Sequence, residues 1–155
     1  MNPFRTVTAR AYQDIDLATG IGSASPHQLV QLLFDGALSA IADARSHLRA
    51  GNVPAKCAAI SRALRIIGEG LHMSLDLEHG GAIAKQLRDL YDYMMRRLVE
   101  ANLKNSQDML AEVSSLLSEI RAAWMQIGER AAAPAPMAAA PALRQDRRAI
   151  NYGIA

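Results

Sequence analysis

The sequence has one cysteine, Cys57, and no uninterrupted apolar run of membrane-spanning length. A single thiol cannot form an internal disulfide, so the chain lacks the paired cysteines typical of secreted disulfide-bonded domains. A bilayer span needs about 20 apolar residues, and the N-terminus also lacks the apolar core of a signal peptide. These absences favour a cytoplasmic protein of the reducing cytosol, with no membrane insertion.

The chain also lacks a large excess of either sign of charge. The 17 basic residues nearly balance the 15 acidic ones, and residues 131–155 contribute Arg144, Arg147 and Arg148 against only Asp146. A protein that binds phosphate backbones needs a broad basic surface. We therefore expect no nucleic acid partner.

The clearest helix start is the segment "SPHQ". Ser25 can cap the helix, Pro26 suits its first position, and Gln28 can reach back to complete a capping box. Apolar residues then keep three- and four-residue spacing until Gly51, a typical helix terminator. The pattern predicts a helix over residues 26–50.

Three further segments show the same helical period. The second helix is capped by Asn52 or Val53 and runs to the break at Gly80-Gly81, and the third ends near Lys104. Asn105 is predicted to cap the fourth, with Asp108 at its third position and its end near Gly128. The predicted inward residues are Cys57, Ile60, Leu64, Ile67, Leu71 and Leu75; then Ile83, Leu87, Leu90, Met94 and Leu98; and finally Met109, Val113, Leu116, Ile120, Trp124 and Ile127.

Long helices joined by short connections favour an antiparallel, up-down arrangement. We therefore predict an all-α fold, a four-helix bundle over residues 25–130. Residues 1–24 contain a short stretch of helix-compatible residues, which predicts a short N-terminal helical segment before the bundle. Residues 131–155 form an Ala/Pro-rich stretch that predicts a disordered tail.

Residues with catalytic potential do not form a complete set in this sequence. Glu69 and His72 have the spacing of a di-iron ligand pair, but that site needs a second such pair and further glutamates. No His is predicted beside Cys57 or a serine, and Cys57 is expected to be a small core residue. We therefore predict no catalytic residue, no metal, no cofactor and no enzyme activity.

Two helices carry more apolar residues than one stripe needs. Tyr91, Met94 and Met95 lie close together in the third helix, and Ile66 adjoins Ile67 in the second. The excess can serve a core that contacts two neighbours, or it can form a groove for an amphipathic partner helix. The pattern alone leaves both interpretations open.

Several segments, in order and spacing, resemble the FliS family of flagellar export chaperones. They are "AY" at 11–12, "SASPHQLVQLLFDGAL" at 23–38, "ALRIIGEGL" at 63–71, "LDLEHGGAIAKQLRDLYDYMMRRLVEANLKN" at 75–105 and "EVSSLLSEIRAAW" at 112–124. The resemblance covers roughly residues 9–128 and does not include the tail.

The resemblance implies a chaperone that binds the C-terminal segment of flagellin in the cytosol. It would prevent premature polymerisation and deliver flagellin to a component of the flagellar export gate. It also implies a groove along the second and third helices. The N-terminal segment, residues 1–24, would pack over the bundle, and a latch of Tyr12 and Ile15 would cover part of the groove when flagellin is absent. A permanent structural role for Tyr12 stays open. The predicted groove residues are Ile60, Leu64, Ile67, Tyr91, Met94 and Met95.

Two rival interpretations belong to other classes. A phosphotransfer bundle would need an exposed helical His, commonly with Lys-Gly three residues later, and none of the four histidines has this pattern. A self-associating structural bundle is compatible with the same periodicity, and sizing chromatography with and without flagellin distinguishes it.

Overall fold

The structure, a computed structural model, describes residues 24–132, the side chains of 130–132 excepted. This part of the chain is helical and contains no strand, which confirms the all-α prediction. The elements are α2 (Pro26–Arg49), α3 (Val53–Arg65), the π-helical segment η1 (Ile66–His72), α4 (Gly81–Lys104) and α5 (Gln107–Ala132).

The chain divides into two compact units, and the bundle belongs to the first, which ends at Ala122. The second unit begins at Ala123 and includes the last turns of α5. The predicted latch residues Tyr12 and Ile15, and the tail from residue 133 onward, lie outside the described residues. The three predicted domain boundaries therefore stay predictions.

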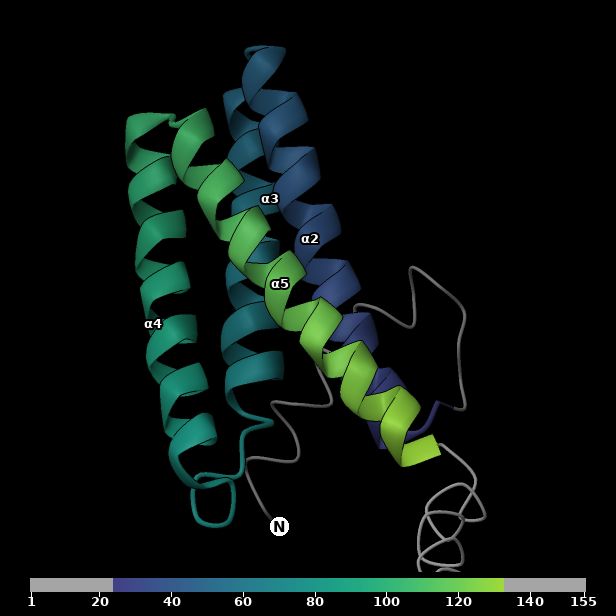
Figure 1. Cartoon of the computed structure of the whole chain (residues 1–155). Helices are drawn as coiled ribbons and strands as arrows, with labels where there is room; N and C mark the ends of the chain where they lie inside the picture. Colours follow the sequence, from purple (N-terminus) through teal and green to yellow (C-terminus); the bar gives the residue numbers. More distant parts are fainter. Residues whose placement is uncertain (1–23, 133–155) are drawn as a thin grey trace, which may run out of the picture. The chain divides into compact units, whose positions relative to one another are not determined.

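Within the first unit, successive helices run in alternating directions (Figure 1). Polar contacts fix the pairing of α2 with α5: Gln107 Nε2 donates to the Arg45 carbonyl at 2.9 Å, and Arg121 Nε donates to Asp35 Oδ1 at 2.5 Å. The partners of successive α5 residues lie progressively earlier in α2, so these two helices are antiparallel.

The start of α2 is the one that the sequence predicts. The Gln28 N–H donates to Ser25 Oγ at 3.2 Å, and the Ser25 N–H donates to Gln28 Oε1 at 2.9 Å, which completes the capping box. The helix ends before Gly51, whose φ of 73° lies in the left-handed region that glycine tolerates. Asn52, one of the two predicted caps, then accepts the Ala55 N–H and begins α3.

The second helix differs from the continuous α-helix that its stripe predicts. From Ile66 the backbone widens into seven π-helical residues, a form that usually occurs as single turns. Gly68 lies in this segment, where a Cβ would approach Met95 Sδ to 3.2 Å. Glycine at this position therefore lets the side chain of Met95 lie against η1.

The predicted cap of the fourth helix is wrong by one residue. Asn105 ends α4 in the left-handed conformation, with a φ of 49°, and Ser106 Oγ accepts the Met109 N–H at 3.2 Å. Asn tolerates this backbone region better than most residues. The helix therefore begins at Gln107, Asp108 is its second residue, and its helical conformation continues past Gly128 to Ala132.

The predicted core is correct in its centre and wrong at several edges. Ile83 is 70% exposed because it lies in the first turn of α4, where Ala84 is buried instead. In α5 the predicted Val113 is buried, whereas the buried residues Leu110 and Leu117 lie one position after the predicted Met109 and Leu116. The half-buried members of the predicted stripes are Cys57, Leu64, Leu75, Leu87, Leu90, Met109, Leu116, Ile120 and Trp124. Ile127, the last predicted inward residue, is 55% exposed.

Among the described side chains, one charged residue is buried together with the apolar core. Lys56 is 2% exposed, and its Nζ donates to the Asn102 carbonyl at 3.0 Å and to Asn105 Oδ1 at 2.6 Å. Both acceptors belong to the end of α4, where carbonyls lack helical partners and the dipole favours a cation. Lys56 thus fastens the start of α3 to the end of α4.

Replacement of Lys56 by methionine should lower the free energy of unfolding by about 1–2 kcal/mol, because both acceptors lose a charged donor while the apolar stem is retained. In a bundle of this size the melting temperature should fall by at least about 4 °C. Urea unfolding and thermal melts measure the effect. Lys85→Met, at an exposed position of α4, is the control, and equal stability of the two variants would contradict the role of Lys56.

Candidate binding groove

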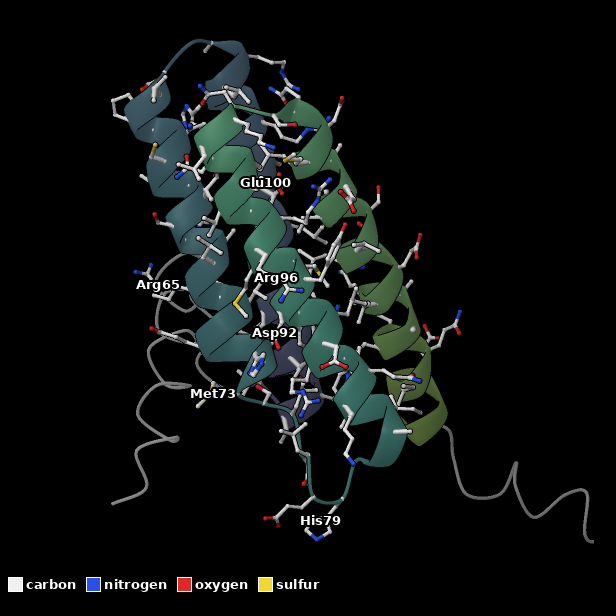
Figure 2. The ribbon with its side chains drawn as sticks, turned by 90° about the vertical axis from the view of Figure 1, so that its left-hand side faces the viewer. Arg65, Met73, His79, Asp92, Arg96 and Glu100 are labelled. Atoms are coloured by element: carbon white, nitrogen blue, oxygen red, sulfur yellow. The ribbon has the colours of Figure 1, made fainter. Side chains whose placement is uncertain are left out.

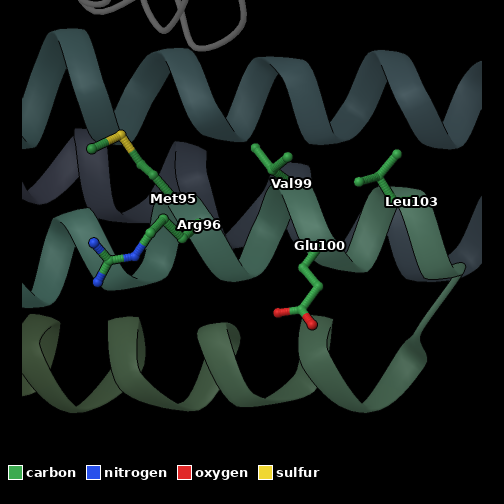
Figure 3. A pocket seen from close by; sticks show the side chains of 5 residues that line it. All are labelled: Met95, Arg96, Val99, Glu100 and Leu103. Atoms are coloured by element: carbon green, nitrogen blue, oxygen red, sulfur yellow. The ribbon is translucent and has the colours of Figure 1, made fainter.

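The surface of α4 contains a hollow of about 340 Å³, lined by Met95, Arg96, Val99, Glu100 and Leu103. Val99 is 48% exposed and Leu103 is 80% exposed. Figure 3 shows the side chains of Met95, Val99 and Leu103 on the side of α4 that faces α3, whereas Glu100 points towards α5. We call the hollow with its five lining residues the α4 groove.

The apolar part of the groove follows from helical spacing. Met95, Val99 and Leu103 recur every four residues, so they share one face of α4. The buried residues of the same helix are Ala84, Tyr91, Met94, Leu98 and Ala101, which form a different face. Helix α4 therefore has two apolar faces, and the second is only partly covered.

Four of the six predicted groove residues lie in the core. Ile60, Ile67 and Met94 are fully buried and Tyr91 is 3% exposed. Burial raises the pKa of the Tyr91 phenol well above its usual value. These side chains support the helices beneath the surface, and their part in binding stays a prediction.

The other two predicted residues, Leu64 and Met95, are half-buried, and only Met95 lines the α4 groove. Val99 and Leu103, which also line the groove, are not among the predicted residues. Their four-residue spacing from Met95 is a signal for a second apolar face, but the neighbouring stripe through Met94 and Leu98 predicts an inward face of the same helix.

The acidic residue of the groove is already paired. Lys104 Nζ donates to Glu100 Oε1 at 2.7 Å, and Arg97 Nη1 donates to Glu100 Oε2 at 3.2 Å. The hydrogen bond from Lys104, and then that from Arg97, hold the pKa of the Glu100 carboxyl below its usual value. Figure 2 shows this side of the helix, with Arg96 and Glu100 labelled on α4.

A second ionic contact holds α4 against α5. Arg97 donates to Glu112 Oε2 through Nη2 at 2.7 Å and Nε at 2.9 Å, and the Tyr93 hydroxyl donates to Glu112 Oε1. The Arg97 guanidinium also lies 6.0 Å from the centre of the Tyr93 ring. These contacts fix the rotation of α4, and therefore which of its faces is left uncovered.

Three further features of the described residues bear on function: one His–Asp contact, the search for metal ligands and the search for membrane spans. His72 Nε2 lies 3.1 Å from Asp92 Oδ1, an ion pair between η1 and α4 when the imidazole is protonated. No group of three His, Cys, Asp or Glu side chains among residues 24–129 is arranged to hold a metal ion. None of the described helices is long and apolar enough to cross a membrane.

The Glu112 contacts predict a dependence of stability on pH. Hydrogen bonds from Tyr93 and then Arg97 lower the pKa of Glu112 in the folded state below the usual value of 4.5. The stabilisation is therefore complete above the unfolded-state pKa and is lost as the pH falls through the lower, folded-state pKa. At neutral pH the wild type should have a higher melting temperature than Glu112→Gln. The difference in melting temperature should shrink as the pH becomes acidic.

Thermal melts of both proteins between neutral and acidic pH measure this difference. Glu119→Gln, at an exposed position of the same helix, should melt like the wild type throughout. A difference between wild type and Glu112→Gln that stays constant with pH would show that the Glu112 carboxylate does not contribute through its ionised form.

Comparison with known proteins agrees with this architecture. The family described as "Flagellar protein FliS" matches residues 8–131. The chain is 50% identical over 122 residues to the flagellar secretion chaperone FliS of Salmonella typhimurium, which covers 79% of this chain and 90% of that protein. It is 43% identical to the flagellar secretion chaperone FliSB of Pseudomonas aeruginosa (74% and 90% covered) and 33% identical to FliS of Bacillus subtilis (75% and 82% covered).

The family match includes α2, α3, η1 and α4, the helix that carries the groove. The chain belongs to the FliS family of flagellar secretion chaperones, and it is a binding protein and not an enzyme.

Proposed function

We propose that this chaperone binds the C-terminal segment of flagellin in the cytosol, keeps it from polymerising, and delivers it to the flagellar export gate. The observation that supports this most directly is the α4 groove, which leaves Val99 and Leu103 exposed on a helix whose C-terminal part is held by polar contacts. Exposed apolar residues at helical spacing suit an amphipathic partner helix.

The physical basis of the binding is a preformed surface and an unfolded partner. A flagellin terminus that becomes helical only on contact can lay its apolar face along Met95, Val99 and Leu103. Covering these residues removes apolar surface from water, which is the main favourable contribution. The segment would then be unable to pair with other flagellin subunits.

The residues proposed to serve flagellin binding fall into two groups. Met95, Val99, Leu103 and the half-buried Leu64 are accessible contacts. Ile60, Ile67, Tyr91 and Met94 are proposed to act from beneath, by setting the positions of α3, η1 and α4.

Substitution Leu103→Glu should weaken the binding of a flagellin C-terminal segment about 10- to 100-fold, because burial of a leucine contributes about 1.5–3 kcal/mol. Isothermal titration calorimetry measures the change. Ile83→Glu is a closely matched control, since Ile83 is also an exposed apolar residue of α4, 70% exposed, but does not line the groove.

Unchanged affinity of Leu103→Glu, with the helical content of the wild type, would place the flagellin site elsewhere. Sizing chromatography of the free protein completes the test. If the free wild type is a dimer that Leu103→Glu dissociates, and flagellin binds neither form, the groove serves self-association instead.

The proposed latch of Tyr12 and Ile15 gives a separate prediction. If the N-terminal segment competes with flagellin for one surface, its removal should leave the affinity equal or higher, because flagellin no longer has to displace it. Deletion of residues 1–18 should also lower solubility. If the deletion lowers both thermal stability and flagellin affinity, the segment is instead a permanent part of the fold.

A further inference from the structure

The α4 groove has a charged edge that differs from its apolar interior. Two ionisable residues, Arg96 and Glu100, line the groove beside the three apolar side chains. They lie four residues apart, a spacing at which an arginine and a glutamate can pair along a helix. In this structure they do not: Glu100 bonds to Arg97 and Lys104, and Arg96 has no ion pair or hydrogen bond with any described residue.

The positions of the side chains explain the difference. Figure 3 shows the Glu100 carboxylate directed towards α5, while the Arg96 guanidinium extends along α4 beside Met95, away from Glu100. Arg97, the next residue, bonds to Glu112 of α5 as well as to Glu100. The Glu100 carboxylate is thus paired with other cations, and Arg96 is the cation that lines the groove without an ion pair to a described residue.

We propose that the groove selects its partner by charge as well as by apolar contact, and that Arg96 binds a carboxylate of the partner helix. This inference rests on the proposed function, because it takes the occupant to be the flagellin C-terminal segment. A helix whose apolar residues cover Met95 and Val99 brings the side chains at the margin of its apolar face close to Arg96. An Asp or Glu at that margin completes the pair.

Arginine suits this role better than lysine. Its planar guanidinium can donate two parallel hydrogen bonds to one carboxylate, which fixes orientation as well as attraction. Because Arg96 is exposed in the free protein, the pair should contribute modestly to affinity and more strongly to the rate of encounter and to the register of the partner helix.

The test measures flagellin binding by calorimetry for wild type, Arg96→Gln and Arg96→Glu. The probe is the C-terminal segment of flagellin from the same bacterium, carried on a soluble fusion protein. Arg96→Gln should bind about 2- to 5-fold more weakly, the range expected for an exposed ion pair. Arg96→Glu should bind about 10-fold more weakly at low salt, because it repels the carboxylate.

Salt dependence separates a charge effect from a change of shape. Between about 0.05 M and about 0.3 M salt the wild type should lose affinity, while Arg96→Gln should lose less. Arg88→Gln is the control, since Arg88 lies on the same helix, is paired with Asp89 at 3.2 Å and does not line the groove. It should bind like the wild type. One acidic residue of the flagellin segment, when changed to arginine, should restore binding to Arg96→Glu.

Two results would overturn the inference, and they differ in meaning. If the wild type binds the segment and both Arg96 variants match it at every salt concentration, Arg96 does not recognise a carboxylate, although the proposed function stands. If the wild type itself fails to bind the segment, the proposed function is wrong and the inference is wrong with it.

Discussion

The two apolar faces of α4 are the constraint on which the rest of the structure depends. One face carries Met94 and Leu98 into the core, and the other leaves Val99 and Leu103 in solvent. Exposed apolar side chains give up the burial that stabilises a small bundle. The fold must therefore hold α4 with contacts that do not need the exposed face. Arg97 provides such a contact with Glu112 of α5, and polar groups act at the end of the helix.

The buried Lys56 and the π-helical segment contact α4 at the two ends of the groove and leave its exposed apolar face uncovered. Lys56 reaches the end of α4 from α3 without covering Leu103, which stays 80% exposed. At the other end of the groove, Gly68 has no side chain to push Met95 away from η1. A π-helical segment inside a longer helix often occurs at functional sites, and here it lies against the first apolar residue of the groove. The structure thus combines a fixed helix with an uncovered apolar face.

Much of this fold, but less of the groove, could be predicted from the sequence. Ser25, Gln28 and Gly51 act through local bonds and backbone preference, which a sequence displays directly, so the limits of α2 were predictable. The choice of Asn105 or Ser106 as a cap depended on which residue takes the left-handed conformation, and both are common near helix ends. The groove was harder because Met94 and Met95 are adjacent. Only the packing of α4 against its neighbours decides that Met94 is buried and Met95 reaches the surface.

Under the proposed function, a preformed groove and an unfolded flagellin segment would together set a moderate affinity. The groove would need little ordering on binding, because α4 is already held by Lys56 and Glu112. The flagellin segment would instead lose conformational entropy equivalent to several kcal/mol when it folds on the surface. Apolar contact along Met95, Val99 and Leu103 must exceed that cost for the complex to form. An exposed charge such as Arg96 adds little to the total but speeds correct encounters. Under the proposed function, such a complex would form quickly and still dissociate when the export apparatus competes for the flagellin segment.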